Sequence, residues 1–159
     1  MRDRILEAGG VQVRFFWQHD RYAHQVLLRR GGTWVVALAT REGSSQDEWP
    51  VSPPFQSLEV SDRAPTQALL VGMAGKSHWS ASVEIEPDGS CITFDVACRL
   101  RAAAGPLGSS YEVGNAQPFH VESTATVTRD EAALHIRPAP AEDALPTTVR
   151  WQYRLRPVD

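Results

Sequence analysis

The sequence predicts an all-β protein, an antiparallel meander of roughly nine or ten strands that forms either a β-barrel or a two-sheet sandwich. Apolar and polar residues alternate with a period of two in many short runs, and turn-forming residues separate these runs. No run predicts a helix longer than a turn or two. A chain of 159 residues fits a single antiparallel β domain, residues 1–159, that can bury a core without disulfides.

The clearest element is a hairpin over residues 79–100. Its apolar positions are Trp79, Ala81, Val83 and Ile85 before an Asp88-Gly89 turn, then Ile92, Phe94, Val96, Cys98 and Leu100 after it. A two-residue type I′ turn would place Ile85 opposite Ile92, and each earlier apolar residue opposite an apolar partner. A slip by one residue would turn one strand's apolar set to the wrong face, so the register is well specified.

The other strands follow from the same alternation. The N-terminal meander has strands at 11–18, 21–30 and 33–40, whose first pair places Val11 opposite Leu28 and Phe15 opposite His24. Further strands are expected at 55–61, 68–74, 119–128, 133–137 and 147–156. Residues 41–54 contain Gly43 and three prolines and read as a long irregular loop, and 101–110 reads as a flexible connection.

Composition and charge limit the partners and the location. A net charge of −3 argues against nucleic acid, and no run approaches the roughly 20 apolar residues of a membrane helix. We see no signal peptide. Cys91 and Cys98 are expected on opposite faces of one strand, Cys91 exposed and Cys98 in the core, too far apart for a disulfide. Free cysteines without an export signal predict a cytoplasmic protein.

Motifs for catalysis and cofactors are weak. Gly75-Lys76-Ser77 matches the end of a phosphate-binding loop, but Leu70 replaces the required glycine and a strand follows where a helix is needed. No serine lies in a nucleophile elbow, and the five histidines lack metal-ligand spacing. His24 reads as a core residue. We therefore assign no catalytic residue, no metal and no cofactor.

The polar face of the 79–100 hairpin is the main candidate site. It carries His78, Ser82, Glu84, Asp95 and Arg99. Glu84 and Asp95 lie diagonally across the two strands, so in a cleft they could act as an acid–base pair, whereas on an open sheet they form a solvated face. Trp49 is a sixth candidate, because an indole in a polar loop either stacks on a sugar ring or plugs the loop into the core.

These features favour binding over catalysis. The first hypothesis is a non-enzymatic binding domain for a small-molecule or carbohydrate-like ligand, with those six residues in the binding site. The alternative is a structural protein that self-associates into a homo-oligomer through its sheet edges. The third hypothesis is a hydrolase that uses the paired carboxylates in a cleft.

Overall fold

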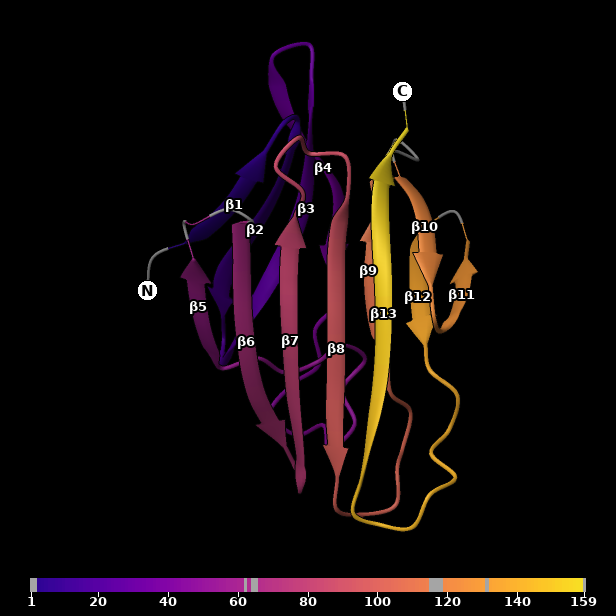
Figure 1. The fold of residues 1–159 in the computed structure, drawn as a ribbon. Helices are drawn as coiled ribbons and strands as arrows, with labels where there is room; N and C mark the ends of the chain where they lie inside the picture. The colour runs from indigo at the N-terminus through magenta and orange to yellow at the C-terminus, as the bar shows by residue number, and fades with distance from the viewer. Residues whose placement is uncertain (1–2, 62, 64–65, 115–118, 131, 159) are drawn as a thin grey trace.

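The structure is a computed structural model, and it describes residues 3–61, 63, 66–114, 119–130 and 132–158. These residues form thirteen strands in two antiparallel sheets, which face each other as a sandwich (Figure 1). The all-β prediction is therefore confirmed. Of the two architectures that the sequence left open, the described strands form the sandwich and no closed barrel. The described part of the chain contains no helix that is long and apolar enough to cross a membrane.

One sheet has seven strands in the order β1-β2-β3-β4-β9-β12-β11. Their bounds are Arg4–Ala8 for β1, Val11–Gln18 for β2, Arg21–Arg30 for β3, Thr33–Thr40 for β4, Ser109–Val113 for β9, Thr126–Arg129 for β11 and Ala133–Arg137 for β12. The first four strands are a simple meander. The remaining three come from the C-terminal third of the chain, which crosses between the sheets (Figure 1).

The other sheet has six strands in the order β10-β13-β8-β7-β6-β5. Their bounds are Ser57–Ser61 for β5, Thr66–Ala74 for β6, Ser77–Ile85 for β7, Ile92–Leu100 for β8, Phe119–Ser123 for β10 and Thr147–Pro157 for β13. Strands β7 and β8 lie in the middle of this sheet (Figure 1). Their outward-facing side chains therefore have neighbours on both sides.

The predicted registers are confirmed. In the β7–β8 pair Ile85 lies opposite Ile92 and Val83 opposite Phe94, and in the β2–β3 pair Phe15 lies opposite His24. The inward-facing residues of β7 and β8 are all buried, as the alternation requires. Burial of one face therefore fixes which side of each strand meets water.

The turn between β7 and β8 differs from the predicted type I′ turn. Such a turn needs positive φ at both central residues, and here Gly89 has a φ of 74° while Asp88 does not. Instead, residues 87–90 form a four-residue loop closed by hydrogen bonds from Glu86 N to Cys91 O and from Gly89 N to Glu86 O. The four-residue loop preserves the predicted pairing because it adds one residue to each side of the turn.

The same loop explains why the prediction for Cys91 is wrong. Cys91 precedes β8 and closes the loop with its backbone, and its side chain is buried rather than exposed. Cys98 lies in the core as expected, and both thiols are free.

The strand count exceeds the predicted nine or ten for three reasons. Strand β1, at the edge of its sheet, was not among the predicted strands, and β9 begins within residues 101–110, which the sequence predicts to be a flexible connection. The predicted strand 119–128 divides into β10 and β11, which belong to different sheets. The chain bends where Ser123 Oγ accepts a hydrogen bond from Ala125 N, and Thr124 N donates to Gln152 O of β13. This bend carries the chain from one sheet to the other at one side of the sandwich.

Candidate functional site

Five of the six predicted site residues lie on the outer face of the six-stranded sheet. His78, Ser82 and Glu84 come from β7, and Asp95 and Arg99 come from β8. The register places His78 beside Arg99 and Ser82 beside Asp95. Glu84 lies opposite Thr93 and so is diagonal to Asp95, as the sequence predicted.

The sixth residue, Trp49, lies elsewhere. Its half-buried indole meets the buried ring of Trp79 edge to face, with the centroids 6.3 Å apart. A Cβ added to Gly105 would lie 2.4 Å from the Trp49 ring, so a second loop closes over the indole. This placement matches the loop plug that the sequence left open beside the sugar-stacking role. Trp49 is therefore separated from the other five residues by the sheet itself.

The outer face is hollowed into a groove of about 550 Å³, a volume in the range of small-molecule sites. Its floor is low because Ser80 and Ala97 are small and stand side by side on β7 and β8. The lining comprises Gln56, Ser57, Val71, Gly72, Met73, His78, Trp79, Ser80, Ala97, Arg99, Thr148 and Arg150. His78 and Arg99 thus belong to the groove, whereas Ser82, Glu84 and Asp95 lie outside its lining.

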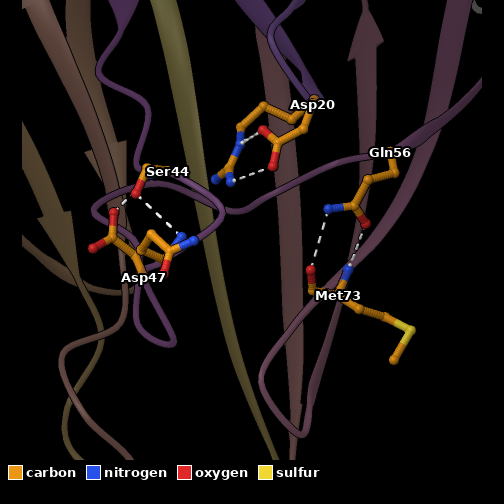
Figure 2. Close-up of polar contacts among 7 residues, drawn as sticks. Asp20, Ser44, Asp47, Gln56 and Met73 are labelled. Atoms are coloured by element: carbon orange, nitrogen blue, oxygen red, sulfur yellow. Dashed lines mark hydrogen bonds and ion pairs between the residues drawn. The ribbon is translucent and has the colours of Figure 1, made fainter.

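The β6 side of the groove is held by the Gln56 side chain. Its amide accepts a hydrogen bond from Met73 N at 2.7 Å and donates one to Met73 O at 3.1 Å (Figure 2). The Gln56 side-chain amide thus satisfies the backbone N–H and C=O of Met73 near the end of β6, as a neighbouring strand would. On the inner side, Gly72 lets the Pro54 carbonyl approach so closely that an added Cβ would lie 1.6 Å from its oxygen. These contacts fix the backbone that carries Val71 and Met73.

The carboxylates that could support hydrolysis are not enclosed by this groove. Asp95 is exposed, and Glu84 is half-buried beside Thr93. Water therefore solvates Asp95 on the open face of the sheet. The pair of side chains keeps its predicted diagonal relation without the cleft that acid–base chemistry requires.

A second polar cluster lies between the sheets, and it includes His24, which the sequence predicts to be a core residue. His24 is buried as predicted, and its Nε2 lies 2.8 Å from the Tyr111 hydroxyl. That hydroxyl in turn lies 2.5 Å from the Tyr153 hydroxyl. Burial lowers the pKa of His24 to about 3 and raises the pKa of Tyr153 to about 12, so both groups are neutral near pH 7.

Glu42 is the residue that the sequence analysis missed. Its Oε1 is buried without a hydrogen-bond partner among the described residues. Burial raises the pKa of Glu42 to about 7, although a Thr40 hydrogen bond and the Arg21 charge act in the opposite direction. The available signal was the alternation of β4 itself, because Leu38, Thr40 and Glu42 continue on one face toward the core.

The interior cavity is too small for a ligand. Glu42, His24, Tyr111 and Tyr153 line a cavity of about 10 Å³, which is room for one water molecule. Over the described ranges, no three His, Cys, Asp or Glu side chains gather as metal ligands do. The groove on the outer face is therefore the larger and more accessible of the two sites.

No protein-family model matches the chain, and comparison with curated proteins and with solved structures finds no match. The geometry of the groove is therefore the basis on which a function can be assigned.

Proposed function

We propose that this protein is a non-enzymatic binding domain that takes a small-molecule or carbohydrate-like ligand in the groove on the outer face of the six-stranded sheet. The observation that carries the proposal is the groove itself, in which hydrogen-bonding and apolar side chains surround a floor of two small residues. Pockets with a few polar groups around an accessible hollow are the usual form of a small-molecule site.

The arrangement of ionisable groups supports binding over catalysis. The groove contains His78 and Arg99, which can hold a ligand, but the carboxylates Glu84 and Asp95 lie outside its lining. The buried histidine and tyrosines bond to one another between the sheets. A cytoplasmic location and the lack of nucleic-acid and membrane partners remain predictions.

The test is a heteronuclear NMR screen of monosaccharides and small organic acids against the full chain. We expect binders to shift the backbone signals of Ser80 and Ala97. Ala97→Leu should fill the floor and abolish these shifts, because the Ala97 side chain faces outward into the groove. Thr93→Leu is the matched control, on the same face of β8 but outside the lining. The proposal fails if no compound moves the groove signals, or if Ala97→Leu binds as the parent does.

A further inference from the structure

The two walls of the groove differ in chemistry. On one side, β6 presents Leu69, Val71 and Met73 to solvent, with 48%, 53% and 52% of each residue exposed. Isolated exposed apolar residues are ordinary, but three in succession on one strand face form an apolar strip. Val71 and Met73 line the groove directly.

The opposite wall is basic. Arg99 of β8 and Arg150 of β13 are exposed, and the register makes them diagonal neighbours because Arg99 pairs with Thr148 and Arg150 with Ala97. The Arg99 guanidinium donates to Thr148 Oγ1 at 3.3 Å. Among the described residues neither arginine has a carboxylate within ion-pair distance, and the groove lining contains no acidic residue.

The strand register sets the spacing between these walls. Val71, Ser80, Ala97 and Arg150 form one row across four neighbouring strands. Strands lie about 4.8 Å apart, so the backbones of β6 and β13 are separated by roughly 14 Å. A ligand that spans the two small residues would reach an apolar wall with one end and a guanidinium with the other. His78, in the next row beside Arg99, adds a ring nitrogen for hydrogen bonding.

We infer that the groove binds an amphipathic oxyanion, with a ring or short alkyl body on Val71 and Met73 and its anionic head on Arg99 and Arg150. This inference rests on the proposed function and names its ligand class. The chain carries a net charge of −3, so a groove lined with two arginines and no acid is a local reversal of sign. Guanidinium groups bind carboxylates, sulfonates and phosphates with paired hydrogen bonds, which explains why an oxyanion is favoured over a neutral sugar.

The test compares three probes by calorimetry and NMR: hydrocinnamate, its neutral amide, and acetate. Hydrocinnamate has both the ring and the anion, the amide lacks the charge, and acetate lacks the ring. We expect hydrocinnamate to bind about tenfold more tightly than either control compound, and to bind less tightly as salt is raised. Its NMR shifts should centre on Ser80 and Ala97.

Matched variants separate the two walls. Arg150→Gln and Val71→Ser should each weaken hydrocinnamate binding about tenfold. Arg154→Gln, on the same face of β13, and Leu69→Ser, on the same face of β6, lie outside the lining and should leave it unchanged. All four side chains are exposed, so the fold should survive, which the spectra of the free variants check.

The outcomes distinguish the ligand class from the binding function. If the amide binds as tightly as the acid and Arg150→Gln has no effect, the groove is a binding site but the oxyanion assignment is wrong. The assignment also fails if hydrocinnamate does not bind while compounds from the broader screen do. If neither set of compounds moves the groove signals, the binding function itself fails. Self-association that Val71→Ser abolishes, without hydrocinnamate binding, would make the strip an interface between copies and overturn the inference.

Discussion

Replacing Glu42 by Gln should stabilise the protein at pH 8 and leave its stability unchanged at pH 4. The Glu42 side chain lines the interior cavity together with the tyrosine pair, and its buried Oε1 has no hydrogen-bond partner in the described part of the chain. Burial penalises the charged form, so the pKa rises from 4.5 to about 7. Glutamine keeps the shape and the polarity of the side chain but never carries the charge.

The sign of the effect follows from proton linkage. The folded pKa lies above the unfolded pKa, so the contribution of Glu42 to stability is fully present below pH 4.5 and is lost as the pH rises to about 7. Each pKa unit corresponds to about 1.4 kcal/mol, so the rise from 4.5 to about 7 gives a loss of at most about 3.5 kcal/mol. Although Oε1 is buried, Glu42 as a whole residue is only half-buried, so solvent screening reduces the loss, and we expect about 1–3 kcal/mol.

His24 has the opposite linkage. Its pKa falls from 6.5 to about 3 in the folded state, so its contribution is present above pH 6.5 and is lost as the pH falls toward 3. Between pH 4.5 and 6.5 the two losses oppose each other, and the parent protein should show little net change from this pair. Glu42→Gln removes the loss that comes from Glu42 and leaves the dependence on His24. The free energy of unfolding of the variant should therefore rise steadily as the pH rises to 6.5.

The assay is urea denaturation of both proteins from pH 4 to 8, followed by tryptophan fluorescence. The control is Glu59→Gln, which removes an exposed carboxyl on β5 instead of a buried one. A Glu42→Gln variant that is less stable than the parent at pH 8 would contradict a raised pKa for Glu42, and so would a stability difference that is the same at every pH.

Three further changes test the core and the close contacts around it. Tyr111→Phe removes the hydroxyl that lies between His24 and Tyr153, so it should cost about 1–3 kcal/mol of unfolding free energy in urea. Phe94→Ala should cost about 3–5 kcal/mol, since the ring is 2% exposed and stacks on Tyr153, and a loss below about 0.5 kcal/mol would contradict its inward position. Gly72→Ala should cost about 1–3 kcal/mol in the same assay, because its Cβ would strike the Pro54 carbonyl, and an unchanged midpoint would show that this loop moves freely.

The candidate site was predictable only in part. His78 and Arg99 were identified from alternation alone, and the structure places both in the groove. Arg150 and Val71 were not predicted as site residues. They come from β13 and β6, and alternation within the β7–β8 hairpin does not show which strands lie beside that hairpin. Trp49 has an unusual position in the sequence, but only the packing against Trp79 shows that its indole faces the interior.

What the sequence determined by itself was local: the all-β class, most of the strands, and the pairing of hairpins such as β2–β3 and β7–β8. Period-two alternation and turn residues act between neighbours in the chain, so they specify which face of each strand is buried. The tertiary structure decided how the strands divide into two sheets, why residues 119–128 become β10 and β11, and why Cys91 is covered. It also buried the Glu42 carboxyl in a cavity that tyrosines from β9 and β13 line, and this burial raises its pKa. These outcomes depend on contacts between segments far apart in sequence. Such contacts produce no periodic pattern of residues along the chain, so the sequence alone does not predict them.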